Sequence, residues 1–199
     1  MIDEGYIKYE CDWRQAPALP LATVAELNDW RNRFHDEQLI GYYKRHGVGF
    51  GNISIRDGAS ERFIISGTQT GHIARTNQNH YAVVTACDID RNHVSCEGPV
   101  QASSEALTHA AIYALDPAIR AIVHVHDKKL WHRLMYRVPT TAHDVYYGTP
   151  EMAREFTRLY RETGFAEERI AEMGGHEDGI VSFGSDIEEA AQRILRYRN

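Results

Sequence analysis

The sequence predicts a mixed α/β domain with a largely antiparallel central sheet. Three observations support this prediction. The first half of the chain holds strand-like segments joined by short turns, and the second half alternates capped helices with β-branched runs. The 199 residues have an ordinary globular composition, with 43% hydrophobic and 25% charged residues. That length is sufficient for one domain whose core needs no disulfide or metal for stability.

Residues 1–20 are expected to form an N-terminal arm, because they lack clear periodicity and end in APALP. Residues 21–199 are expected to form one domain, since no repeat, low-complexity tract or linker divides them. The first helix is predicted to begin at Thr23, and Glu26, three residues later, would complete a capping box. The apolar face of this helix is formed by Leu27, Trp30 and Phe34.

Strands and tight turns are predicted for the next part of the chain. Residues 41–62 are rich in glycine and predict a hairpin with its turn at Asp57-Gly58, after which residues 63–65 return as a strand. Further strands are predicted over residues 81–87 and 93–96, joined by a turn-like segment. This succession of neighbouring strands indicates antiparallel pairing.

The second half is predicted to alternate helices with the strands 121–126 and 180–183. Each helix begins at a capping residue, and the candidates are Ser103 or Ser104, Thr149 and Ser185. Pro150 at the first helical position supports the second start, and Glu188 would complete a capping box at the third. The helix that follows the two serines is expected to reach about Leu115.

Charge and cysteine content narrow the class of protein. Acidic residues outnumber basic ones 28 to 22, which gives a net charge of -6, so we expect no nucleic-acid partner bound through a broad basic face. No stretch approaches the ~20 apolar residues that span a bilayer, so we expect no membrane partner. The N-terminus has no apolar signal segment, and Cys11, Cys87 and Cys96 form no CxxC pair. These features predict a cytoplasmic protein with free thiols.

Two of the 11 histidines share one face of a predicted strand. In AIVHVH, residues 121–126, His124 and His126 project to the same side because residues i and i+2 of a strand do so. Two neighbouring imidazoles are a common way to chelate a metal ion. On spacing alone, a pair of ordinary histidines at a strand end is an equally weighted alternative.

A third metal ligand is expected from GGHEDG, residues 174–179, which precedes a predicted strand. His176 is the best ligand by residue type. Glu177 and Asp178 are alternative oxygen ligands, or partners that would orient an imidazole. Taken alone, the segment is more typical of a polar turn, so the metal hypothesis depends on the histidine pair.

Ser103, Ser104 and Glu105 stand at a predicted helix N-terminus, where backbone N–H groups and the helix dipole favour an anion. The alternative is an ordinary serine cap with an acidic first turn. Two further segments, GFGNIS (residues 49–54) and SGTQTG (residues 66–71), have the backbone composition that wraps a phosphate. Each of these segments alone is typical of a turn.

These elements, in this order, resemble the class II aldolase/adducin family. The resemblance rests on GNISIR, SGTQTG, SSEALTHAAIY, AIVHVH, YGTPEMA and GHEDGIVSFG, which run from about Gly41 to the end of the chain. The distance from SSE to HVH is its specific part. The resemblance implies a three-layer α/β/α fold and a homotetramer with sites at subunit interfaces.

The resemblance also implies roles for individual residues. His124 and His126 would bind a metal ion, usually zinc, although Co2+, Mn2+ or Fe2+ also suit such a site. Glu105 would be the catalytic acid/base. The substrate phosphate would be bound by Gly51, Asn52, Thr70, Gly71, Ser103 and Ser104.

The sequence departs from the family at three places. The family places a histidine directly before the glycine that enters the last strand, where this chain has Asp178; we favour His176 as the third ligand because nitrogen ligation suits zinc. The segment 138–147 is shorter than in the sugar-phosphate aldolases. The family places a catalytic tyrosine near its C-terminus, where this chain has only Tyr197, and we do not assign that role to Tyr197. The candidates for the unassigned proton donor are His109, Tyr113 and His143.

We therefore expect a metal-dependent aldolase that cleaves a small hydroxyketone or sugar through an enediolate that the metal stabilises. We expect this substrate to carry a phosphate group. Dehydration, decarboxylation or epimerisation of a sugar phosphate at the same site is the first alternative. A non-catalytic, adducin-like scaffold domain is the second, although a scaffold has no need of HVH and SSE.

Overall fold

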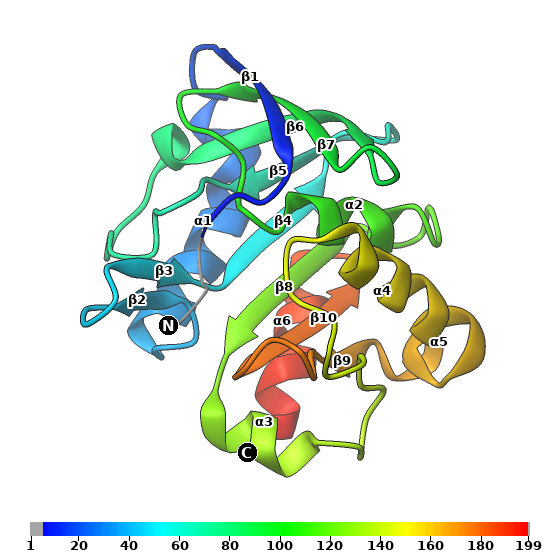
Figure 1. Cartoon of the computed structure of the whole chain (residues 1–199). Coiled ribbons are helices and arrows are strands. Elements are labelled where there is room, and N and C mark those ends of the chain that lie inside the picture. The colour runs from blue at the N-terminus through cyan, green and yellow to red at the C-terminus, as the bar shows by residue number, and fades with distance from the viewer. Residues whose placement is uncertain (1–5, 199) are drawn as a thin grey trace.

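An eight-stranded sheet runs through the centre of the computed structural model, which describes residues 6–198 (Figure 1). Across the sheet the strands lie in the order β1-β7-β6-β5-β4-β8-β10-β9. Their bounds are β1 Glu10–Gln15, β4 Asn52–Arg56, β5 Phe63–Ser66, β6 Tyr81–Asp88, β7 His93–Gly98, β8 Ala121–His126, β9 Ile170–Glu172 and β10 Gly179–Gly184. Strands β1 and β7 are parallel and the other neighbours are antiparallel, which confirms the predicted largely antiparallel sheet.

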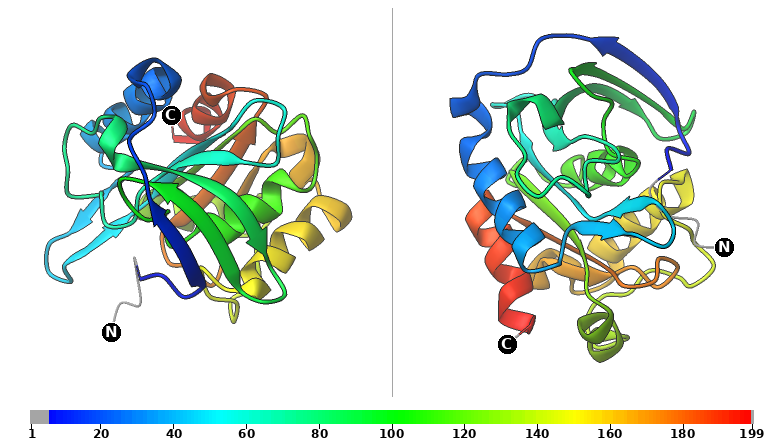
Figure 2. Two further views of the ribbon diagram at one scale, coloured as in Figure 1. Left: turned by 90° about the horizontal axis from the view of Figure 1, so that it is seen from above. Right: turned by 90° about the vertical axis from the view of Figure 1, so that its left-hand side faces the viewer.

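Helices cover both faces of this sheet, so the molecule has three layers (Figure 2). Helices α1 (Leu21–Asp36) and α6 (Ile187–Arg198) lie side by side on one face. Helices α2 (Ala106–Tyr113), α4 (Pro150–Glu162) and α5 (Phe165–Glu168) cover the other face. Each face has its own apolar core, because successive side chains of the strands point to opposite sides. The three-layer architecture that the resemblance implied is therefore confirmed.

The smaller elements lie around the rim of the sheet. A separate hairpin pairs β2 (Gly41–Tyr43) with β3 (Val48–Phe50), and a 3-10 turn, η1, covers Gln78–His80. Helix α3 (Lys128–Leu134) follows β8 directly, and its first turn is capped by the Asp127 carboxylate, which accepts a hydrogen bond from the Leu130 N–H. Its buried face extends the core beneath α6.

Three predicted helix starts differ from the observed ones, and the first two are those of α1 and α6. Helix α1 begins at Leu21 rather than Thr23, because Pro20 is the N-cap and the Thr23 N–H donates to the Pro20 carbonyl. The predicted capping box of Thr23 with Glu26 is therefore wrong. At α6 the predicted box of Ser185 with Glu188 does not form: the Asp186 carboxylate accepts from the Glu189 N–H, and the Glu189 carboxylate accepts from the Ser185 N–H.

The helix predicted to follow Ser103 or Ser104 begins at Ala106, and Glu105 is its N-cap. Ser103 still contributes, because its Oγ accepts a hydrogen bond from the Glu105 N–H at 3.3 Å. The predicted start of α4 is confirmed: the Thr149 side chain accepts from the Met152 N–H, and Pro150 occupies the first helical position.

The segment expected to be an N-terminal arm contains strand β1, which adds a parallel edge to β7. Its hydrogen-bonded register begins with Glu10 opposite His93 and continues to Gln15 opposite Gly98. Of the expected arm, residues 1–5 lie outside the described residues.

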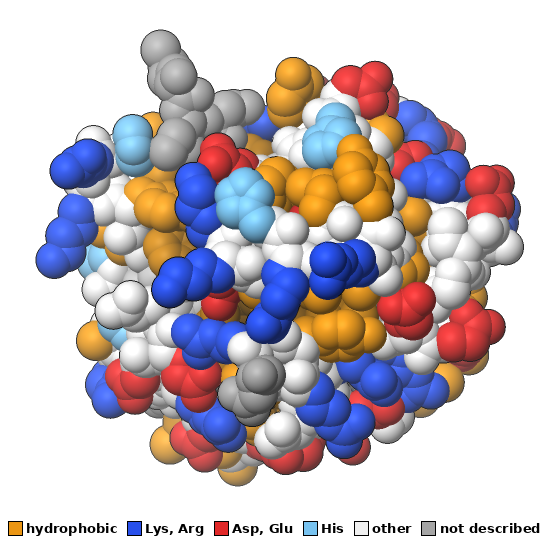
Figure 3. All heavy atoms as spheres, turned by 90° about the horizontal axis from the view of Figure 1, so that it is seen from below, with side chains coloured by type: hydrophobic (Ala, Val, Ile, Leu, Met, Phe, Trp, Pro, Cys, Tyr) orange, Lys and Arg blue, Asp and Glu red, His pale blue; other side chains and the backbone are white. Residues whose placement is uncertain are grey.

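Basic side chains gather on the face that carries α3, seen from below in Figure 3. The exposed ones of α3 and the turn after it are Lys128, Lys129, Arg133 and Arg137. Acidic side chains surround this cluster, and Lys128 pairs with Glu177 at 3.2 Å. Within residues 6–198, no helix is both long enough and apolar enough to cross a membrane.

Candidate functional site

The two histidines of strand β8 lie side by side at its C-terminal end. Their Nε2 atoms are 3.1 Å apart, and the residues are 0% and 4% exposed. Val123 and Val125 belong to the apolar core of the opposite face. The period-two alternation of the strand therefore places His124 and His126 together, as their spacing predicted.

His176 joins this pair from the loop between β9 and β10. Ligand nitrogens of His124, His126 and His176 all lie within 4.8 Å of one another. Gly175 allows the approach, because a Cβ at that position would lie 1.9 Å from the Val145 carbonyl oxygen. Asp178, the alternative ligand, is not part of the cluster, and its carbonyl accepts from the Asp127 N–H.

The carboxylate of Glu105 faces the histidines from the N-cap of α2. It is 2% exposed, and its oxygens lie 3.2 Å from His124 Nε2 and 3.1 Å from His176 Nδ1. Asn52 donates to the same carboxylate at 3.4 Å. Burial by itself raises the pKa of Glu105, but His124 and His176 outweigh burial and lower this pKa to about 2. Positive charge at these imidazoles causes the lowering, and a divalent ion held by the same nitrogens would act on the Glu105 pKa in the same direction.

The surroundings of the imidazoles suit metal binding. His124 Nδ1 lies 3.2 Å from the Ile180 carbonyl oxygen, which can only accept, so Nδ1 carries a proton and the neutral ring offers the Nε2 lone pair to a metal ion. His126 Nδ1 lies 3.1 Å from the Tyr43 hydroxyl, which orients the second ring. Three convergent imidazole nitrogens form a donor set that zinc and related divalent ions accept. The residues present therefore fit a divalent metal ion.

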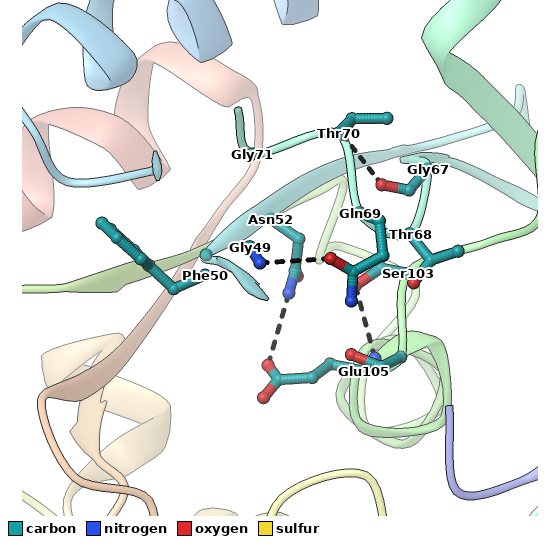
Figure 4. A pocket seen from close by; sticks show the side chains of 12 residues that line it. Gly49, Phe50, Asn52, Gly67, Thr68, Gln69, Thr70, Gly71, Ser103 and Glu105 are labelled. Carbon is teal, nitrogen blue, oxygen red and sulfur yellow. Dashed lines mark hydrogen bonds between the residues drawn. The ribbon is translucent and has the colours of Figure 1, made fainter. Parts of the chain in front are cut away.

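The residues expected to bind phosphate all line one pocket, and Glu105 lies at its edge (Figure 4). They are Gly51, Asn52, Thr70, Gly71, Ser103 and Ser104. The Thr70 hydroxyl donates to the Gly67 carbonyl at 2.8 Å and thereby shapes the loop. Gly71 permits close packing of this loop, because a Cβ there would lie 1.9 Å from the Gly41 carbonyl oxygen. The loops thus bring small side chains and backbone together beside the carboxylate.

Three residues near the site were not predicted. Arg31 is fully buried, and its guanidinium donates to the carbonyls of Thr70 and Ile73, which fixes the pocket loop to α1. Tyr43 contacts His126, and the Tyr147 ring stacks on His176 with centroids 4.7 Å apart. Arg31 did carry a sequence signal, since it lies four residues after Leu27 on the apolar face of its helix. No local pattern pointed to either tyrosine.

The three candidate proton donors occupy different places. His143 is exposed on the loop before α4, where its ring nitrogens contact the Tyr136 hydroxyl and the Gly174 carbonyl. His109 and Tyr113 are buried on α2, one and two turns beyond Glu105. Both of these side chains contact Ser54 on β4.

Comparison with known proteins agrees with this architecture. The family model described as Class II Aldolase and Adducin N-terminal domain matches residues 38–199. No curated protein matches the sequence.

Similar solved structures include three sugar-phosphate enzymes. An L-fuculose 1-phosphate aldolase is 19% identical, with 90% of this chain and 84% of that chain covered and a TM-score of 0.67. The L-fuculose-1-phosphate aldolase from Thermus thermophilus is 21% identical, with 87% and 93% covered and a TM-score of 0.56. A sugar-phosphate aldolase from Thermotoga maritima is 16% identical, with 88% and 90% covered and a TM-score of 0.67.

At these identities the solved structures establish a shared fold, and the family model establishes the membership. It spans most of the chain and includes the strands and loops that carry Glu105 and the three histidines. The chain therefore belongs to the class II aldolase and adducin N-terminal domain family.

Proposed function

We propose that this protein is a metal-dependent, aldolase-type lyase acting on a small, phosphorylated hydroxyketone or sugar. One observation carries the proposal: a buried carboxylate lies within 3.2 Å of two members of a three-histidine cluster. A scaffold domain gains no stability from such a group of buried polar side chains. An enzyme gains a ligand set and a base in one place.

His124, His126 and His176 would hold the metal ion. Zinc is the ion we expect, and Co2+, Mn2+ or Fe2+ are compatible with the same ligands. When bound, such an ion supplies Lewis-acid polarisation of a substrate oxygen. Three protein ligands leave coordination positions for that substrate.

Glu105 would handle the proton. Positive charge at the histidine cluster keeps its carboxylate ionised, burial shields it from water, and Asn52 donates a hydrogen bond that holds it in place. Such a group accepts a proton from bound substrate and, once protonated, returns it to the carbon atom left after C–C cleavage. Because the same carboxyl group both gains and loses the proton, the cycle ends with the enzyme unchanged.

The adjacent pocket would hold the phosphate. Ser103 and Ser104 stand at the N-terminus of α2, and the 67–71 loop faces them across the pocket. Hydroxyls and backbone N–H groups of this kind bind phosphate oxygens. An anchored phosphate would contribute binding energy away from the reacting carbons.

We also expect a homotetramer, and light scattering of the purified protein would measure its mass in solution.

The test is a metal analysis followed by a substrate panel. We expect purified protein to contain a stoichiometric divalent metal and to release an aldehyde from at least one ketose phosphate. Chelation should abolish that release, and added metal should restore it. Absence of bound metal together with absence of turnover would contradict the proposal and favour an adducin-like scaffold.

Product analysis separates the alternative reactions at the same site. Loss of carbon dioxide would identify a decarboxylase, loss of water a dehydratase, and an isomer of the substrate an epimerase. Any of these products in place of an aldehyde would retain the metal site but overturn the aldolase assignment.

A further inference from the structure

A row of polar contacts joins strand β4 to helix α2 directly behind Glu105. On β4, Asn52, Ser54 and Arg56 alternate with Ile53 and Ile55. Ile53 and Ile55 pack in the core beneath α1 and α6, so the other three side chains point to the opposite face, where α2 lies.

Their partners stand one helical turn apart at the start and along the length of α2. Asn52 Nδ2 donates to Glu105 Oε2 at 3.4 Å. Ser54 Oγ lies 2.7 Å from His109 Nδ1 and 2.8 Å from the Tyr113 hydroxyl oxygen. We call this row of side chains, continued by Arg56, the β4–α2 ladder.

The contacts of the β4–α2 ladder can repeat because every second residue of the strand and every fourth residue of the helix advance by a similar distance. Two residues of a strand advance about 6.7 Å, and four residues of a helix advance about 6 Å. Arg56 completes the last step: its Nη2 donates to the Tyr113 carbonyl at 2.6 Å, and its guanidinium lies 4.7 Å from the Tyr113 ring centroid. Strand and helix are thus joined by polar contacts over the whole length of α2.

The hydrogen bonds of the ladder define the tautomer of His109. Burial lowers the pKa of His109 to about 3, so the ring is neutral and one nitrogen carries the proton. If Tyr113 donates to Ser54 and Ser54 donates to Nδ1, only the Nε2–H lacks a partner among the described residues. The reverse direction leaves two groups unpaired, the Tyr113 proton and the Nε2 lone pair. The first direction is therefore favoured.

Apolar packing restricts the sliding of a short helix along a sheet less sharply than hydrogen bonds do, because apolar attraction has no direction. Hydrogen bonds are directional and lose strength within a few tenths of an ångström. We infer that Ser54, His109 and Tyr113 are positioning residues, which fix α2 against β4 and so set the place of the Glu105 carboxylate at the histidine cluster. This inference rests on the proposed function of Glu105 as the acid/base.

A first experiment tests the hydrogen bonds of the β4–α2 ladder without an activity assay. Nitrogen-15 NMR of the metal-loaded protein labelled at histidine reports which ring nitrogen carries the proton, and His109→Gln identifies the His109 signals by their loss. We expect the Nε2–H tautomer in the parent protein and a shifted Nδ1 signal in Ser54→Ala. An Nδ1–H tautomer, or a signal that Ser54→Ala leaves unmoved, would overturn the ladder.

A second experiment measures positioning with a matched control. Ser182→Ala removes a buried hydroxyl that donates to the Ala190 carbonyl at 2.7 Å, on the opposite side of the sheet from α2. A small displacement of a catalytic group costs up to about 100-fold in rate. We expect Ser54→Ala to lower kcat about 10-fold or more with unchanged KM and metal content, Ser54→Thr to restore it, and Ser182→Ala to leave it within about 2-fold.

Equal losses of kcat in Ser54→Ala and Ser182→Ala would overturn the inference, since both would then report stability alone. If Ser54→Ala does not fold, Tyr113→Phe replaces it, with Tyr81→Phe as control because Tyr81 is also buried and donates to Asn28. A larger loss of kcat in Tyr113→Phe supports the ladder, and equal losses oppose it. If the parent protein turns over no substrate, the proposed function fails, and the NMR result still decides the ladder.

Discussion

The side chains proposed to bind metal and transfer the proton lie around the C-terminal end of β8. Glu105 and His124 are almost fully removed from water, and each has a polar partner within 3.2 Å. Buried polar groups are tolerated only when they are paired with one another or with a ligand. A metal ion that binds this cluster would stabilise the folded protein further, because the ion binds the folded state alone.

The choice of third ligand is testable at this scale. We expect His176→Ala to weaken zinc affinity by more than about 100-fold, since even the loss of an orienting neighbour costs 10–100-fold. Asp178 has a left-handed backbone, at φ 68°, which asparagine also tolerates. Asp178→Asn should therefore leave the zinc affinity nearly unchanged. Competition with a coloured chelator measures both. His132→Ala, at an exposed position on α3, is the control, and a larger effect of Asp178→Asn would reverse the assignment.

The site residues were predictable to different degrees. His124 and His126 follow from a period-two strand pattern, and Glu105 follows from the resemblance together with its place at a helix start. Arg31 and Tyr43 act on residues 39 and 83 positions away in the chain. The apolar face of α1 indicated that Arg31 is buried, but these two contacts depend on how distant elements pack, and local patterns do not reveal them.

Among the elements, those with strong local signals were predicted best. The run of residues 121–126 coincides with β8, and Thr149-Pro150 marks the start of α4. Strand β1 was missed because most of its residues are exposed and its parallel pairing with β7 joins distant segments. Helix α3 was missed because seven residues are too few to show periodicity. Caps were displaced where several capping residues stand together, as at Ser185 and Asp186.

The cap of α4 gives a prediction at the scale of the element. The Thr149 hydroxyl accepts from the Met152 N–H at 3.3 Å, so Thr149→Ala should lower the free energy of unfolding by about 1 kcal/mol. Thr157→Ala makes the same chemical change inside α4 and should be neutral or slightly stabilising, because alanine favours a helix interior. Urea unfolding of the two variants measures the difference. Equal destabilisation by both changes would contradict the capping role.

Stability of the whole molecule is predicted to respond to pH through Glu172. This side chain is fully buried on β9, and burial raises its pKa to about 7, with a smaller opposing effect from a hydrogen bond with Thr140. Between the ordinary pKa near 4.5 and this raised value, the unfolded chain loses the proton while the folded protein keeps it. The folded state therefore loses stability as pH rises through this window, and the loss is complete above the raised pKa.

Replacing the carboxyl group removes this dependence. We expect Glu172→Gln to gain about 2 kcal/mol in free energy of unfolding relative to the parent protein between about pH 5 and pH 8. Urea unfolding of metal-free protein at the two pH values measures the gain. Glu167→Gln, at an exposed position on α5, should show no such gain, and a pH-independent effect of Glu172→Gln would argue against the raised pKa.

At the scale of the molecule, the two layers of helices and the sheet bring six distant segments to one place: the 49–52 and 67–71 loops, the start of α2, the end of β8, and the loops that hold Tyr147 and His176. We propose that this place is a metal-dependent catalytic centre in which Glu105 moves the proton.

The decisive measurement is a metal titration of metal-free protein, with aldehyde release followed at each addition. We predict that activity rises in proportion to added metal, stops rising at one ion per chain, and is lost in Glu105→Gln while that variant still binds the metal. Aldehyde release that does not depend on metal, or that Glu105→Gln leaves intact, would contradict the assignment of this catalytic centre.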